Sequence, residues 1–158
     1  MQQLIISAVL SSLVLVLCVL RPNAGRVLLG LFFLVMAMEV NVVLVFVAPE
    51  QFVALGTYDA IVPLYRWFSE NVVAVAPPLF GALAAAYEVA IALLMLSRGR
   101  YARWGLIGGV AFLTGITPLG VWTLANPILA VALVCLLTKD QDRSLPQMLR
   151  PGTAPRAG

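Results

Sequence analysis

Two glutamates, Glu39 and Glu88, are the residues of this 158-residue chain whose type and position could do chemistry. Each lies near the middle of a long apolar run, and neither run contains a basic residue. A carboxyl group in apolar surroundings without a cationic partner favours its protonated form. If the two runs lie side by side, we expect a carboxyl pair that keeps at least one proton and donates a hydrogen bond to a carbonyl-bearing lipid or quinone headgroup.

A purely structural role for these glutamates is the alternative. Each protonated side chain could bond a backbone carbonyl or Tyr87 and so tie two helices together. Asn126, in a later apolar run, could bond across helices in the same way, and Tyr87 and Asn126 complete the candidate proton- or ligand-binding residues. Asn41 is two positions after Glu39, so we predict that it points to another side of its helix, toward the first apolar run.

The residue types needed for most cofactor chemistry are missing from the sequence. The chain has no histidine, and its two cysteines, Cys18 and Cys135, are isolated. A protein-ligated metal, haem or iron–sulfur centre is therefore not expected, and the ligand we expect, if any, is a bound quinone or lipid. No catalytic residue can be assigned, so an enzyme is the less favoured class.

The composition is that of a membrane protein. Hydrophobic residues make up 62% of the chain and charged residues 11%, with a mean hydropathy of +1.01, which lies outside the range of soluble domains. These values exclude a disordered chain, a soluble enzyme and a disulfide scaffold. The basic residues flank apolar runs, as membrane topology requires, which argues against nucleic-acid binding.

The apolar runs predict an all-α bundle of five transmembrane helices, because a span needs about 20 apolar residues. Proline ends the second run at Pro49 and begins the third at Pro78. Pro118 and Gly120 are turn formers that divide the stretch 104–137 into two helices. The predicted spans cover residues 4–20, 27–47, 78–96, 101–117 and 119–138, and they form a single domain of residues 1–138.

The basic residues predict the orientation of this bundle. With five spans, nearly all of them fall on one side of the membrane and only Arg66 falls on the other. Because basic loops stay in the cytoplasm, we expect a multi-pass membrane protein with its N-terminus outside. The polar tail of residues 139–158 is then cytoplasmic, and we expect it to be largely disordered.

The outer loop between the second and third spans predicts an interfacial helix over about residues 60–73. Apolar residues recur there at helical spacing, and Arg66 with Glu70 would form an i, i+4 ion pair on the polar face. We expect this amphipathic segment to seal one end of the bundle, and a substrate lid is the alternative.

Small residues predict where the spans pack closely, since close approach of backbones drives helix association in lipid. They are Gly81 and Ala85 in the third span and Gly105, Gly109 and Gly115 in the fourth. We therefore expect these two spans to be in close contact.

From residue 26 to residue 138, the order of these features resembles that of the DoxX-like family of small bacterial membrane proteins. The matching stretches are Arg26 to Phe33 opening a helix, an outer loop, Pro78 to Leu96 with the carboxylate of Glu88, a basic turn, and Leu124-Ala125-Asn126 in the last helix. The family pattern often has a Gly and then a Lys at the end of its first helix, where this chain has Ala37 and Val40.

The resemblance implies a four-helix core in the bacterial plasma (inner) membrane, to which residues 4–20 add an N-terminal helix. Family members are linked to quinone-coupled sulfur oxidation and redox homeostasis. We therefore expect an accessory subunit of a membrane redox or energy-converting complex that could shape a quinone or lipid site, with oxidoreductase or respiratory subunits and the lipid bilayer as partners.

Two other functions remain open at this point. One is a small membrane enzyme or carrier for an isoprenoid or quinone, with Glu39 and Glu88 as acid and base. The other is an assembly factor for another membrane protein. A channel or transporter is less favoured, because the chain has no recognisable inverted repeat and few polar residues to line a path.

Overall fold

The computed structural model describes residues 2–58 and 60–149, and every regular element within these ranges is a helix. The predicted all-α class is therefore confirmed. In chain order the elements are α1 (Gln2–Leu20), α2 (Pro22–Met36), the π-helical segment η1 (Ala37–Leu44), α3 (Val45–Val47), α4 (Pro49–Thr57), α5 (Pro63–Asn71), the 3-10 turn η2 (Val73–Val75), α6 (Pro77–Leu96), α7 (Arg100–Ile116), the 3-10 turns η3 (Thr117–Leu119) and η4 (Val121–Ala125), α8 (Asn126–Leu137) and α9 (Leu145–Leu149).

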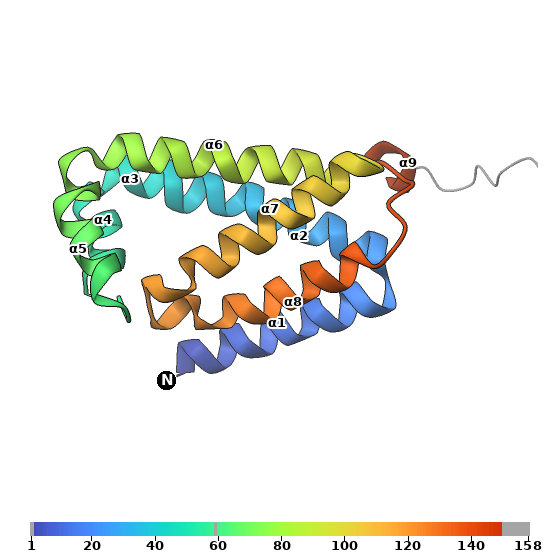
Figure 1. Ribbon diagram of the computed structural model, residues 1–158, viewed down its shortest axis with the longest axis horizontal. Coiled ribbons are helices and arrows are strands. Elements are labelled where there is room, and N and C mark those ends of the chain that lie inside the picture. The colour runs from blue at the N-terminus through green and yellow to red at the C-terminus, as the bar shows by residue number, and fades with distance from the viewer. Residues whose placement is uncertain (1, 59, 150–158) are drawn as a thin grey trace, which may run out of the picture.

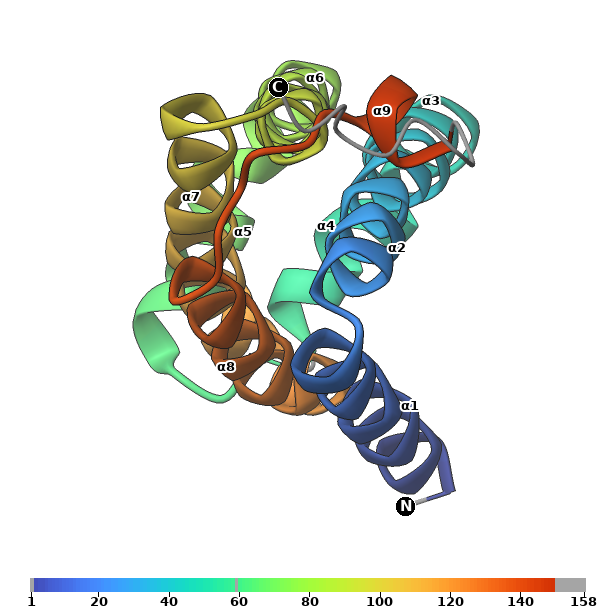
Figure 2. The same ribbon diagram turned by 90° about the vertical axis from the view of Figure 1, so that its right-hand side faces the viewer.

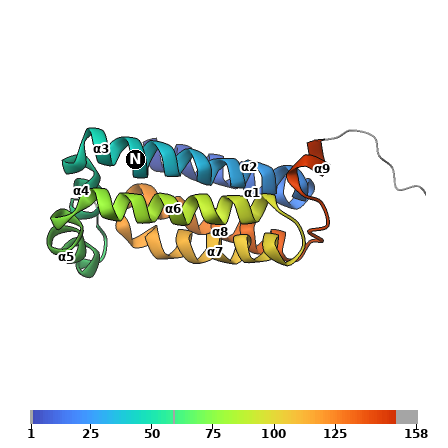
Figure 3. The ribbon, with the colours of Figure 1, turned by 90° about the horizontal axis from the view of Figure 1, so that it is seen from above.

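The long helices lie side by side and close into a ring. α1 packs against α2 and α8, α2 packs against α6, α6 against α7, and α7 against α8. Figure 1 shows that their axes run in roughly one direction, and Figure 3 shows the same bundle from above. The view along the bundle in Figure 2 shows the ring, with α1 at its lower corner.

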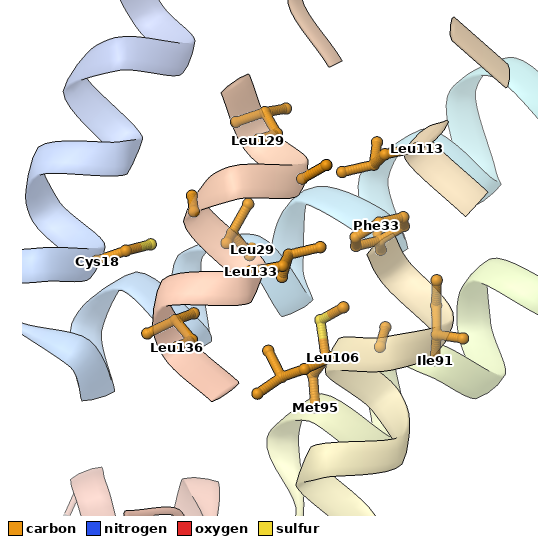
Figure 4. Close-up of a cluster of buried hydrophobic side chains, with 13 residues drawn as sticks. Cys18, Leu29, Phe33, Ile91, Met95, Leu106, Leu113, Leu129, Leu133 and Leu136 are labelled. Atoms are coloured by element: carbon orange, nitrogen blue, oxygen red, sulfur yellow. The ribbon is translucent and has the colours of Figure 1, made fainter. Parts of the chain in front are cut away.

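Apolar side chains from each helix of the ring form a buried cluster inside the ring (Figure 4). Among them are Cys18 of α1, Phe33 of α2, Met95 of α6, Leu106 of α7 and Leu133 of α8, all of which are buried. The bundle is therefore packed at this level and does not form an open pore.

Two helical segments, Pro22–Val47 and Pro77–Leu96, are long and apolar enough to cross a membrane, and Leu4–Leu20 and Thr123–Leu137 are shorter apolar helices. The first of these segments begins at Pro22 and not at the predicted residue 27, because proline is favoured in the first turn of a helix. The last predicted span opens with the 3-10 turn η4, and α8 itself begins only at Asn126.

The outer loop forms a cap that is larger than the single helix predicted for residues 60–73. The helix there, α5, is shorter than predicted, and α4 and η2 accompany it. The amide of Ile61 donates a hydrogen bond to the carbonyl of Pro118 over 3.1 Å, and the hydroxyl of Tyr65 donates to the carbonyl of Gly115 over 2.6 Å. These bonds hold the cap against the end of α7.

The predicted ion pair between Arg66 and Glu70 is absent from this cap, and that prediction was wrong. Arg66 instead donates from Nε to the carbonyl of Thr57 at 3.0 Å, which ties α5 to the end of α4. An exposed i, i+4 pair contributes only tenths of a kcal/mol, so a backbone carbonyl at a helix end competes with it easily.

The first part of the tail is also more ordered than predicted. Gln141 is buried, and its backbone carbonyl accepts a hydrogen bond from the amide of Gly99 at 2.7 Å. Its side-chain amide donates to the carbonyls of Leu136 at 2.7 Å and Lys139 at 3.1 Å, while its Oε1 accepts from the buried guanidinium of Arg26. The rest of the predicted tail, residues 150–158, lies outside the described residues.

Candidate functional site: a buried Asn41–Glu88 pair

Glu88 is the ionisable residue buried in the middle of α6, with only 3% of its surface exposed. It lies on the same face of the helix as Gly81, Ala85 and Ala92, which are also buried. These neighbours are small, and the backbones of α6 and η1 come close together at Gly81. Glu88 therefore points into the protein, as its small neighbours in the sequence indicate.

The partner of Glu88 is Asn41, an unexpected result. Nδ2 of Asn41 donates a hydrogen bond to Oε2 of Glu88 at 2.6 Å. We expected Asn41 to point toward α1, and we expected Glu39 to face Glu88. Instead Asn41 is buried against α6, and Glu39 is exposed on the outside of the bundle.

The π-helical segment η1 explains why Asn41 faces inward. Phe33, Ala37, Asn41 and Val45 follow each other at four-residue spacing, and all are buried. In an α-helix four residues turn through about 400°, so a face with this spacing would rotate away by about 40° at every step. A π-helix closes wider i to i+5 turns and so rotates less per residue, which cancels this drift. The same face thus stays against α6.

The direction of the two side chains completes the contact. In an α-helix the Cα–Cβ bonds tilt toward the N-terminus of the helix. α2 and α6 run in opposite directions, so Asn41 leans toward the α9 end of the bundle while Glu88 leans toward the cap. The two polar groups therefore meet between the helices, although their backbones lie at different depths.

Gly81 brings the two backbones together next to this pair. A methyl group at Gly81 would lie 2.7 Å from the carbonyl oxygen of Asn41 and 2.5 Å from Cγ2 of Val45. Only a residue without a side chain fits here without a shift of one helix, which fixes η1 against α6 one turn from Ala85.

The other predicted polar residues lie elsewhere. Tyr87 faces away from the pair, stacks on Phe112 with 5.5 Å between ring centroids, and donates from its hydroxyl to the carbonyl of Gly108 at 3.1 Å. Asn126 is half-buried at the start of α8. Among the described residues no hydrogen bond links Tyr87 or Asn126 to Asn41 or Glu88.

The glycines of the fourth predicted span differ from one another. A methyl group at Gly105 would lie 2.4 Å from the amide nitrogen of Met95, and one at Gly109 would lie 2.4 Å from Cε of the same residue. Gly105 therefore lies where the backbones of α7 and α6 approach closely, whereas Gly109 faces the ends of side chains in the core. Gly115 has open space around its Cα, so it makes no close helix contact, and its carbonyl accepts the Tyr65 hydroxyl.

The site offers one carboxyl group and one amide group for hydrogen bonding in an apolar setting. A protonated carboxyl has one donor and further acceptor positions, and an amide has two donors and one acceptor. Their mutual bond leaves donor and acceptor capacity on both groups. Among the described residues no set of three or more His, Cys, Asp or Glu side chains could hold a metal ion.

Comparison of the chain with protein-family models, with curated proteins and with solved structures gives no match. The residues and their geometry must therefore carry the functional argument.

Proposed function

We propose that this chain is an integral protein of the bacterial plasma membrane that crosses the bilayer five times, through α1, α2–α3, α6, α7 and η4–α8. The outer faces of these helices expose large apolar side chains, for example Leu13, Val35, Leu83, Ile107 and Val131. Monomeric soluble proteins rarely expose continuous apolar surface of this extent. A bilayer would cover it, and α7 with 17 residues is about 26 Å long, close to the thickness of the hydrocarbon layer.

The charged residues support one orientation of this bundle. The end that carries α9 (right in Figure 1) has the basic residues Arg21, Arg26, Arg98, Arg100, Arg103, Lys139 and Arg143. At the opposite end, the cap has Arg66 together with Glu50 and Glu70. By the positive-inside rule the α9 end is cytoplasmic and the cap and the N-terminus lie outside.

Within this topology we assign the protein a binding role, as a DoxX-like accessory subunit of a membrane redox or energy-converting complex. The observation that carries the assignment is the buried pair of Asn41 and Glu88. Burying ionisable and polar side chains inside a membrane bundle costs free energy, and such residues often mark functional sites. The pair suits a quinone carbonyl or a lipid headgroup. An acid–base mechanism would use Glu39 as well, and the outward position of Glu39 favours binding over catalysis.

The test is purification from native membranes through a C-terminal tag into lipid nanodiscs, with mass spectrometry of the proteins and of the extracted lipids. We expect a stoichiometric oxidoreductase or respiratory subunit and an enriched quinone or lipid. Glu88→Leu should lose the enriched small molecule, because it removes both the donor and the acceptor that the carboxyl group offers.

Glu39→Leu is the matched control, since it makes the same chemical change in the neighbouring helix at an exposed position. It should keep the bound molecule at the level of the unmodified protein. A chain that purifies alone with ordinary bulk lipid, or a folded Glu88→Leu variant with unchanged ligand content, would refute the proposal.

A further inference from the structure

A second candidate site lies in the cap, on the side where α4, α5 and the start of α6 meet. A hollow of about 610 Å³ opens there, within the range of about 300–1,000 Å³ that is typical of small-molecule sites. Its lining includes Pro49, Val53, Tyr58 and Pro77, together with the acidic residues Glu50 and Glu70. The hollow thus has an apolar floor and two acidic groups that come from different helices.

Both carboxylates are left available to the hollow. Among the described residues, neither Glu50 nor Glu70 makes a hydrogen bond or an ion pair. The expected partner of Glu70 is Arg66, one helical turn earlier, but the guanidinium of Arg66 bonds the carbonyl of Thr57 instead. Within the described part of the chain, no cation therefore forms an ion pair with Glu70.

The two glutamates lie at opposite ends of their helices. Glu50 is in the first turn of α4, where a negative charge is favourable next to the free amides. Glu70 is the penultimate residue of α5, where a negative charge is unfavourable next to the free carbonyls. A bound cation would relieve the unfavourable position of Glu70.

The depth of the hollow relative to the membrane-spanning segments indicates that such a cation would belong to a lipid headgroup. The two segments that are long and apolar enough to cross a membrane end at Val47 and begin at Pro77, and the hollow is lined by Pro49, Pro77 and Pro78. With those segments in a bilayer, the hollow lies at the depth of the lipid headgroups. The apolar floor would then cover the glycerol end of a lipid, and the carboxylates would face its headgroup.

We propose that this hollow binds the primary ammonium headgroup of a membrane lipid of the phosphatidylethanolamine type. A primary ammonium donates up to three hydrogen bonds, and its bonds to carboxylates are charge-assisted. The exposed ring of Tyr58 at the rim adds a surface for a cation. A quaternary ammonium would lack the donors, and an anionic headgroup would be repelled by both glutamates. The inference uses the membrane arrangement proposed above but not the Asn41–Glu88 site.

Native mass spectrometry of the full chain, released from detergent with defined lipids, tests the proposal. The lipids are phosphatidylethanolamine, phosphatidylcholine and phosphatidylglycerol with identical acyl chains. We expect the ethanolamine lipid to be retained best, and Glu50→Gln with Glu70→Gln to lower its retention by roughly three- to tenfold. Asp140→Asn, an exposed carboxylate at the α9 end, is the matched control and should leave retention unchanged.

Three outcomes would overturn the proposal. The first is equal retention of the three lipids by the unmodified protein. The second is unchanged retention of the ethanolamine lipid by a double variant whose circular dichroism matches the parent. The third is loss of calcium binding in the double variant without loss of the lipid, which would make a divalent cation the occupant. Loss of the headgroup preference in a protein that still purifies with a quinone would leave the proposed function intact.

Discussion

The side-chain amide of Asn41 donates to the carboxyl group of Glu88 over 2.6 Å between the π-helical segment η1 and α6. Both residues are at least nine-tenths buried, with 7% and 3% of their surfaces exposed. An unpartnered polar group of this kind costs free energy in an apolar interior. The bond therefore both joins the two helices and keeps a protonatable group inside the bundle.

Removal of one partner should destabilise the bundle more than removal of both. We expect Asn41→Leu to lower the free energy of unfolding by about 1–2 kcal/mol, because it leaves the Glu88 carboxyl buried without its donor. Asn41→Leu combined with Glu88→Leu should recover part of this loss. Reversible unfolding in mixed micelles measures Asn41→Leu, Glu88→Leu and the double variant, and strictly additive effects would show that the two side chains do not stabilise each other.

The close approach at Gly81 gives a second prediction. Gly81→Ala should lower the stability by about 1–3 kcal/mol, because the new methyl group would overlap the carbonyl of Asn41 and the side chain of Val45. Gly115→Ala is the matched control, since open space surrounds Gly115. Thermal unfolding in detergent compares the two, and equal midpoints would mean that α6 and η1 separate easily at Gly81.

Much of the helical framework could be predicted from apolar run length and from proline positions. Helices begin at Pro22, Pro49, Pro63 and Pro77, as the preference of proline for the first turn implies. The inward face of α6 around Glu88 also follows from its small neighbours. The cap was predicted only in outline, because α4 is short and its contacts with α5 depend on residues distant in sequence.

The partner of Glu88 could not be predicted, because the apolar run indicates an ordinary α-helix and α-helical periodicity places Asn41 on another face. The π-helical segment changes the phase of the helix between Ala37 and Leu44. This change turns Asn41 inward and leaves Glu39 outside. The four-residue spacing of Phe33, Ala37, Asn41 and Val45 was the available signal, because a constant face at that spacing does not fit a regular α-helix.

The orientation of the bundle gives a third prediction. In a Cys18→Ala, Cys135→Ala background, a cysteine at Tyr58 should react with a membrane-impermeant maleimide added to intact spheroplasts, because the cap is outside. A cysteine at Lys139 should react only after the membrane is opened. Both side chains are exposed, so accessibility to the reagent is not limited by packing. The reverse pattern would invert the proposed topology.

The contacts of Gln141 give a fourth prediction, about the cytoplasmic end. Its side chain bonds Arg26 at the start of α2 and the carbonyls at the end of α8, and its backbone bonds Gly99 in the turn before α7. A single residue thus joins three parts of the ring. Gln141→Ala keeps the backbone bond but removes the side-chain bonds, so the segment after α8 should open more often.

Limited trypsin digestion in detergent measures this opening, because Lys139 and Arg143 flank Gln141. We expect cleavage there to be several-fold faster in Gln141→Ala, since cleavage follows the population of the open form when opening and closing are fast. Asp142→Ala is the control, because Asp142 is exposed and adjacent to the same cleavage sites. Equal cleavage rates in both variants would mean that the backbone bond to Gly99, and not the side chain of Gln141, holds this segment against the bundle.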